Sequence, residues 1–220
     1  MMKTFSLGKT HLGLEITGYE WTSSVTTAPN VLILGGVHGD EIEGVIASFG
    51  LITHFRQLYS LGLNLFIIPQ FNFDGVLART RGNSRGVDLN RNLPTSDWSS
   101  VAATPRYHPG SEACSENENK ALLQYIQTKN FSFIYSLHSW KPMLNINGNA
   151  RAVAEVIHRR TGYTIEEDIG YPTPGSLGSY GLEKKIPVLT YEIERGLEFR
   201  KILEIHVPAI AESLVALEAL

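Results

Sequence analysis

A short apolar strand, an amphipathic helix and a second apolar strand follow one another near the start of the chain. The first run, Val-Leu-Ile-Leu at residues 31–34, ends in Gly35-Gly36, and the second run covers residues 63–68. Between them, from Glu41 to about Tyr59, apolar side chains recur at every third or fourth position, which is typical of a helix with one buried face. Apolar strands on both sides of such a helix predict a βαβ unit, and therefore a largely parallel sheet with helices on its faces.

The rest of the chain extends this pattern without an internal repeat or a linker. Further strands are expected at residues 12–21, 131–137 and 187–193, and further helices from Ser115 as a cap, at 150–160, and at 197–220 with an interruption near Pro208. With 220 residues, 43% of them hydrophobic, the chain can bury one sizeable core. We therefore expect residues 1–220 to form a single α/β domain, with a mixed, largely parallel β-sheet flanked by helices.

Composition excludes several classes of protein. The 19 basic and 22 acidic side chains give a net charge of −3, which offers no electrostatic footprint for nucleic acid or for an anionic membrane surface. The single cysteine, Cys114, cannot form an internal disulfide, and no apolar run approaches the roughly 18 residues of a membrane helix. Because the first residues lack the apolar core of a signal peptide, we expect a cytoplasmic protein. A monomer and a dimer fit this composition equally well.

His38 and Glu41 stand where the first apolar strand passes into the helix. Ligand sites of open α/β sheets gather at this end of the strands, and two side chains three residues apart can reach one point there. Imidazole nitrogen and carboxylate oxygen are both ligands of Zn²⁺. The alternative is that His38 caps a turn while Glu41 favours the helix N-terminus. The spacing alone leaves both interpretations open.

Residues 71–114 show no periodicity and are rich in Gly, Asn, Arg, Ser and Pro. Most connections in compact domains are about 4–6 residues long, so a segment of this length predicts a function. It holds Arg81, Arg85 and Arg91, and a guanidinium is a planar fork that suits a carboxylate; a solvated basic loop is the alternative. Further on, His138 ends a buried strand, where a hydrogen-bonded core histidine is the alternative. Glu192 lies within an apolar strand, where a charge is costly unless it is paired or functional.

Taken in order, these motifs resemble the zinc carboxypeptidase family. The pattern is His-x-x-Glu, Asn-x-Asp-Gly, an arginine before Gly-Val-Asp-Leu-Asn-Arg-Asn, a strand-end histidine, a tyrosine and Thr-x-Glu, and it runs from His38 to Glu192. Six ordered motifs are far more specific than one. Within the family, residues 171–180, Tyr-Pro-Thr-Pro-Gly-Ser-Leu-Gly-Ser-Tyr, look closest to the bacterial murein peptide amidases. Those enzymes cut the bond between γ-D-glutamate and meso-diaminopimelate in cell-wall peptides.

The resemblance implies one Zn²⁺ per chain. His38, Glu41 and His138 match the three zinc ligands of the family, a set of two histidines and a glutamate. Asp88 matches an outer carboxylate that would fix the tautomer of His38. The alternative outside the enzymes is a zinc-binding module without catalytic activity.

The resemblance also implies roles in catalysis and substrate binding. Glu192 matches the general base and acid that activates a zinc-bound water, and Arg81 the arginine that stabilises the oxyanion. Asn90 and Arg91 match the pair that holds a substrate carboxylate, and Tyr171 the mobile tyrosine over the cleft. The expected substrate is a small murein peptide. Another metallocarboxypeptidase activity, or a deacylase of the aspartoacylase and succinylglutamate desuccinylase type, are the rival enzyme hypotheses.

Two departures from the family pattern affect specificity. Asp40 stands where the pancreatic enzymes have an arginine, so their contacts with an extended substrate need not transfer. Trp140-Lys141-Pro142 after His138 matches no pattern that we can assign. The floor of the pocket for the leaving residue is expected near Leu177 and Gly178.

Overall fold

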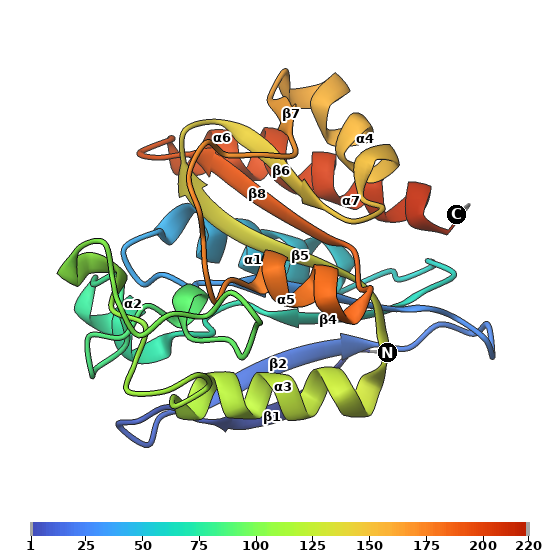
Figure 1. Cartoon of the computed structure of the whole chain (residues 1–220). Helices are drawn as coiled ribbons and strands as arrows, with labels where there is room; N and C mark the ends of the chain where they lie inside the picture. The colour runs from blue at the N-terminus through green and yellow to red at the C-terminus, as the bar shows by residue number, and fades with distance from the viewer. Residues whose placement is uncertain (1, 219–220) are drawn as a thin grey trace.

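The computed structural model describes residues 2–218 and contains an eight-stranded mixed sheet (Figure 1). The central strands are nearly continuous apolar runs, as expected for strands that are covered on both faces. The strands are β1 (Lys3–Lys9), β2 (Glu15–Trp21), β3 (Asn30–Gly35), β4 (Asn64–Ile68), β5 (Phe131–Trp140), β6 (Met143–Asn147), β7 (Thr164–Glu166) and β8 (Val188–Glu194).

The strands lie in the order β1-β2-β4-β3-β5-β8-β6-β7. The four central strands, β4, β3, β5 and β8, pair in parallel, whereas β1, β2 and β6 join through antiparallel pairs. From β3 the chain passes to β4 on one side, and β5 then pairs with β3 on the other side. The sheet therefore has a topological switch between β3 and β5, which is where open α/β sheets form a crevice beyond the carboxyl ends of their strands.

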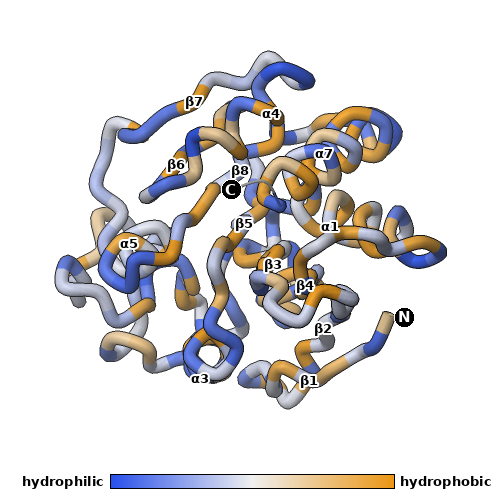
Figure 2. The backbone as a smooth tube through the Cα atoms, turned by 90° about the vertical axis from the view of Figure 1, so that its right-hand side faces the viewer, coloured by the Kyte–Doolittle hydropathy of each residue, from blue (hydrophilic) through white to orange (hydrophobic). Residues whose placement is uncertain are grey.

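Helices cover both faces of the sheet. One apolar core lies beneath α1, α4 and α7, and the other beneath α3 and α5; Figure 2 shows the two groups on opposite sides of the strands. The helices are α1 (Ile42–Phe55), α2 (Phe73–Ala78), α3 (Asn117–Lys129), α4 (Arg151–Thr161), α5 (Leu177–Lys184), α6 (Phe199–Lys201) and α7 (Val207–Leu217). No helix among residues 2–218 combines the length and apolarity that crossing a membrane requires.

The predicted fold class is confirmed, and the predicted βαβ unit corresponds to β3, α1 and β4. Several boundaries were wrong. Ser115 does not cap α3: the cap residue is Glu116, and the Ser115 hydroxyl donates instead to the Glu116 carboxylate at 2.6 Å. The last helix is interrupted by a π-helical turn at Ile202–His206, and Pro208 lies in the first turn of α7. The expected helical residues 219–220 lie outside the described part of the chain.

The long connection between β4 and α3 is compact. It contains α2 and two 3₁₀ turns, at Leu89–Arg91 and Pro105–Tyr107, which the missing periodicity had hidden. Apolar side chains of this segment, Val87, Leu89 and Leu93, are buried. The connection is therefore held firmly at the carboxyl edge of the central strands.

Candidate active site and metal centre

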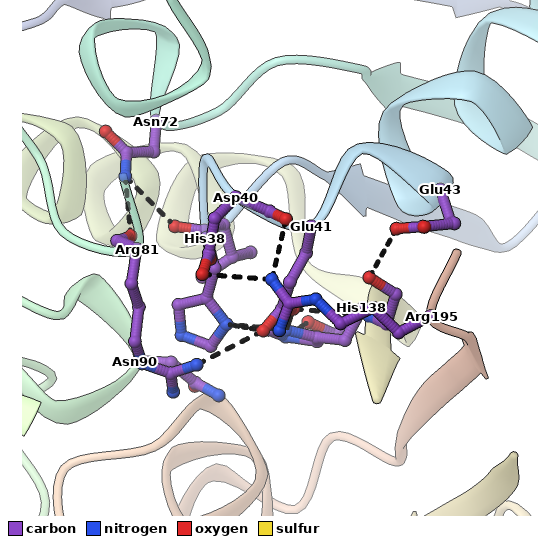
Figure 3. A network of polar contacts seen from close by, with 12 residues as sticks. His38, Asp40, Glu41, Glu43, Asn72, Arg81, Asn90, His138 and Arg195 are labelled. Atoms are coloured by element: carbon purple, nitrogen blue, oxygen red, sulfur yellow. Dashed lines mark hydrogen bonds and ion pairs between the residues drawn. The ribbon is translucent and has the colours of Figure 1, made fainter. Parts of the chain in front are cut away.

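Three predicted metal ligands converge at the switch point of the sheet. His38 follows β3, Glu41 directly precedes α1, and His138 lies in β5. Glu41 Oε1 lies 2.9 Å from His38 Nδ1, Glu41 Oε2 lies 2.8 Å from His138 Nδ1, and the two Nδ1 atoms are 3.1 Å apart (Figure 3). All three side chains are buried.

Close backbone packing holds the His38 loop in place. A Cβ atom on Gly39 would lie 1.9 Å from the carbonyl carbon of Gly75, so only glycine lets this loop rest on α2. Asn72 caps α2 by accepting from the Gly75 amide at 3.0 Å, and its side-chain amide donates to the Val37 and Arg81 carbonyls. The Asn-x-Asp-Gly motif thus joins the His38 loop to the segment that carries Arg81.

The arrangement of the two imidazole rings fits a metal ion. Nε2 of His38 donates to Asp88 Oδ1 at 3.0 Å, and Nε2 of His138 lies 3.0 Å from Ser136 Oγ. With both Nε2 atoms held by an outer oxygen, the two Nδ1 atoms face the Glu41 carboxylate, and such outer partners are typical of metal-binding histidines. Zn²⁺ takes His nitrogen and carboxylate oxygen at about 2.0–2.2 Å. His38, Glu41 and His138 therefore form a donor set suited to zinc, and their role as ligands stays a prediction.

Charges within the cluster control its protonation. Burial opposes a charge on Glu41, but the two histidines hold the pKa of this carboxyl well below its usual range. Burial likewise opposes a charge on His38, yet Glu41 and Asp88 raise its pKa. Burial lowers the pKa of His138, which favours the neutral ring that binds metal. Asp88 stays ionised because His38 and Arg81 hold its pKa far below the usual value, against the effect of burial.

Arg81 is fixed beside this cluster by two carboxylates. Its Nε donates to Asp88 Oδ2 at 2.8 Å, and its Nη1 donates to Glu41 Oε1 at 3.1 Å. Burial alone would lower the pKa of Arg81, but Asp88 and Glu41 raise it, so the guanidinium stays charged. The Tyr107 ring centroid lies 5.1 Å from the Arg81 guanidinium carbon and 5.3 Å from that of Arg91, within cation–π range.

Glu192 is the half-buried carboxylate that the mechanism predicted from the sequence requires. It lies on β8, where its Cα pairs in register with that of His138. Its Oε2 atom is buried and has no hydrogen-bond partner among residues 2–218. Burial, reinforced by the negative charge of Glu41, raises the pKa of Glu192 to about 8. A carboxyl group with a pKa near neutrality can both accept and return a proton.

All of the predicted site residues except Asp88 line one cleft of about 450 Å³. Asp88 lies behind it and accepts from both His38 and Arg81. Asn90 Oδ1 accepts from the Leu177 amide at 2.8 Å, which ties the 3₁₀ turn to α5. Tyr171 is 41% exposed at the mouth of the cleft, and its ring packs edge-on against Trp140 with centroids 5.9 Å apart.

The cleft also contains residues that the sequence did not indicate. They come from the 3₁₀ turn at 105–107, from β6 and from the segment after β8: Arg106, Tyr107, Asn145, Asn147 and Arg195. The predicted floor at Gly178 does line the cleft, whereas Leu177 is buried in the core. For β6 a signal was present, because Leu144 and Ile146 alternate with polar residues.

Comparison with known proteins indicates the family to which the chain belongs. The family model described as zinc carboxypeptidase matches residues 1–167. The murein peptide amidase A of Vibrio campbellii is 29% identical over 200 residues, which are 86% of this chain and 78% of the relative. That of Escherichia coli K12 is 27% identical over 203 residues, which are 86% of this chain and 82% of the relative.

Solved structures agree with the sequence comparison. The murein-tripeptide amidase of Escherichia coli O157 superposes with a TM-score of 0.79 at 26% identity, over 96% of this chain and 91% of that one. The thrombin activatable fibrinolysis inhibitor superposes with a TM-score of 0.83 at 19% identity, over 100% of this chain and 70% of that one, and shares the fold. The family match, the two structures and the His-Glu-His cluster lead to one conclusion: this chain belongs to the zinc carboxypeptidase family of hydrolases.

Proposed function

We propose that the chain is a zinc-dependent amidase that hydrolyses the bond between γ-D-glutamate and meso-diaminopimelate in murein peptides, with residues 1–220 forming one catalytic domain. The observation that carries the proposal is the convergence of His38, Glu41 and His138 with the Glu192 carboxylate in one cleft. The murein peptide amidases among its relatives support this choice of substrate. Cytoplasmic location and a role in cell-wall recycling stay predictions.

His38, Glu41 and His138 would hold the zinc ion. When bound, this ion supplies Lewis acidity, which makes water a nucleophile near neutral pH and polarises the scissile carbonyl. Glu192 then takes the proton of the attacking water and passes it to the leaving amine.

Arginine side chains stabilise the developing negative charge and bind the substrate carboxylate. Arg81, held by Asp88 and Glu41, presents its guanidinium to the oxygen on which negative charge develops. Arg91 and Asn90 bind the carboxylate of the leaving residue and so place the scissile bond, while Tyr171 covers the cleft. The floor beneath is polar, with Asn145, Asn147 and Thr190. It suits the distal amine and carboxylate of diaminopimelate better than an apolar side chain.

Replacement of Glu192 separates metal binding from chemistry. Glu192→Gln is expected to retain stoichiometric zinc and the native fold but to lower kcat by at least about 100-fold, because it cannot accept the proton. Glu194→Gln, an exposed change on the same strand, is the matched control. Near-normal turnover of the Glu192→Gln protein would assign the general base to another residue.

A substrate panel tests the specificity. L-Ala-γ-D-Glu-meso-diaminopimelate should be cleaved to the dipeptide and diaminopimelate, and amidation of the carboxylate beside the scissile bond should lower kcat/KM roughly 10- to 150-fold, since Arg91 loses a charge-assisted partner. Preference for ordinary C-terminal residues would indicate another metallocarboxypeptidase. Preference for N-acyl amino acids would indicate a deacylase, and bound zinc without hydrolysis a non-catalytic module.

A further inference from the structure

Two arginines meet at one carboxylate on the rim of the cleft. Arg106 donates through Nη2 to Asp40 Oδ2 at 3.0 Å. Arg195 Nη2 forms an ion pair with the same oxygen at 2.9 Å and donates to the Asp40 carbonyl at 2.7 Å. Both arginines line the cleft. They come from segments 66 and 155 residues away from Asp40 in the sequence, so the fold itself brings these two positive charges together.

The backbone around Arg195 is firmly held. The Arg195 amide donates to the Trp140 carbonyl at 3.1 Å, and the next amide, of Gly196, donates to the buried Glu43 carboxylate at 2.6 Å. Glu43 also accepts from Ser139 at 2.6 Å. The segment after β8 is therefore fastened to the end of β5 and to α1, and Arg195 keeps its place beside the metal-binding cluster.

This group of three side chains is not electrically balanced. Two guanidiniums share one carboxylate, which leaves a net positive charge. Among the described residues, the hydrogen bonds of both arginine side chains use Nη2 alone, while a guanidinium carries five N–H donors. The side chains of Arg106 and Arg195 are 48% and 40% exposed. Donors thus remain available to an anion that enters the cleft.

The position of Arg195 places this positive charge near the acyl side of the substrate, which is the part that contains the scissile carbonyl. In Figure 3, Arg81 and Asn90 approach the cluster from one side and Arg195 approaches it from the other. Asn90 and Arg91 serve the leaving residue in the proposed function. Arg195 therefore lies toward the part of the substrate that bears the scissile carbonyl, and Arg106 reaches the same place through its contact with Asp40.

We propose that Arg106 and Arg195, gathered by Asp40, form an anion subsite for the free α-carboxylate of a γ-linked glutamyl residue on the acyl side of the scissile bond. This inference rests on the proposed function. A γ-glutamyl group carries its α-carboxylate four bonds, or about 5 Å, from the scissile carbonyl carbon, whereas an ordinary α-peptide has no backbone carboxylate there. The subsite thus makes the enzyme select γ-glutamyl amides over ordinary peptides, through charge-assisted hydrogen bonds.

The test compares two substrates that differ in one group. L-Ala-γ-D-Glu-meso-diaminopimelate is assayed beside its analogue with a carboxamide in place of the glutamyl α-carboxylate. The wild type should prefer the acid by at least about 10-fold in kcat/KM. Arg195→Gln and Arg106→Gln should each lower kcat/KM for the acid by about 10-fold or more but change that for the amide by less than about 3-fold. Arg195→Lys should keep more of the preference for the acid over the amide than Arg195→Gln does.

The control is Arg160→Gln, which removes an exposed ion pair with Glu212 outside the cleft and should leave both rates unchanged. Equal losses for acid and amide in Arg195→Gln and Arg106→Gln would make these arginines structural and overturn the subsite. An unchanged preference for the acid in both variants would overturn it as well. No cleavage of either peptide by the wild type would instead overturn the proposed function, and the subsite with it.

Discussion

At the scale of single residues, Gly178 and Asn147 define the floor of the cleft together. A Cβ atom on Gly178 would lie 2.3 Å from Asn147 Oδ1, so the glycine leaves the space that this amide occupies. Asn147 Oδ1 is buried and has no hydrogen-bond partner among residues 2–218. A buried acceptor without a partner is costly, and the distal ammonium of diaminopimelate would satisfy it.

Gly178→Ala should therefore impair use of the diaminopimelate peptide without removing the metal. The added methyl group displaces the Asn147 amide, and loss of a hydrogen bond to a charged group costs about 1.5–3 kcal/mol. We expect kcat/KM to fall about 10-fold or more, measured by steady-state kinetics, with unchanged zinc content. Leu182→Ala, an exposed change on the same helix, is the control. Unaltered kinetics of the Gly178→Ala protein would show that Asn147 does not contact the substrate.

The sequence could indicate some of these residues and not others. His38 and Glu41 have a local spacing that suggests a shared ligand, and the geometry agrees with it. Arg106 and Arg195 have no such spacing, because each acquires its place through a contact with Asp40 that is distant in sequence. Asn147 is likewise brought to Gly178 by the packing of α5 against β6.

At the scale of elements, α5 shows how a segment with two glycines can form a helix that the sequence gives little reason to expect. Two glycines in its eight residues argue against a helix, yet a Cβ on Gly181 would lie 2.3 Å from a Val188 side-chain carbon and 2.7 Å from the Ile186 carbonyl oxygen. Close packing on β8 therefore outweighs poor propensity. One local signal was present: Ser176 caps the helix by accepting from the Ser179 amide at 3.1 Å.

Strands at the borders of the sheet were harder to predict than the central ones. β1 buries none of its residues fully and β7 has only three residues, so neither carries the continuous apolar run that marked β3, β4 and β5. Their places depend on pairing with β2 and β6. The sequence of such a strand alone gives little signal, because its position depends on the neighbouring strand.

The π-helical turn before α7 contains a histidine whose titration should control stability in acid. His206 is buried, its ring packs on Tyr163 and Tyr191, and its Nδ1 lies next to the Tyr191 hydroxyl. Burial lowers the pKa of His206 to about 4, from an ordinary value of 6.5. The unfolded chain therefore binds a proton more readily, and this histidine destabilises the fold as pH falls from about 6.5 to 4.

Replacement by a neutral hydrogen-bond acceptor should remove this dependence. His206→Gln should lose less stability than the wild type between pH 7 and 4, by up to about 3 kcal/mol in the free energy of unfolding. Urea unfolding at a series of pH values measures the difference. Parallel curves for wild type and His206→Gln would mean that His206 does not titrate in this range.

At the scale of the whole molecule, the cluster of His38, Glu41 and His138 depends on the central sheet. His138 lies 97 residues after Glu41 and 100 after His38, and only the parallel pairing of β3 with β5 brings them together. The unfolded chain cannot hold the three side chains in this arrangement, so a bound metal stabilises the folded state.

Zinc should therefore raise the unfolding temperature. At a free concentration about 1,000 times Kd, a ligand stabilises the folded state by about 4 kcal/mol, which is about 10 °C for a domain of this size. Differential scanning calorimetry with zinc and with a chelator measures the shift. His38→Ala should unfold at the same temperature under both conditions. A chelator without effect on the wild type would contradict the proposed metal site.

The Asp88 carboxylate accepts from three residues with three proposed tasks: from His38 Nε2 (metal binding), from Arg81 Nε (stabilising the oxyanion) and from the backbone amide of Asn90 (substrate binding). Substitutions at His38 and Arg81 are therefore not independent, because the two side chains share this carboxylate. In evolutionary terms, Asp88 makes them epistatic. A substitution that changes metal affinity at His38 is therefore expected to change stabilisation of the transition state by Arg81 as well. Changes of specificity are expected more readily at Arg106 and Arg195 on the rim and at Asn147 and Gly178 on the floor, which do not contact Asp88.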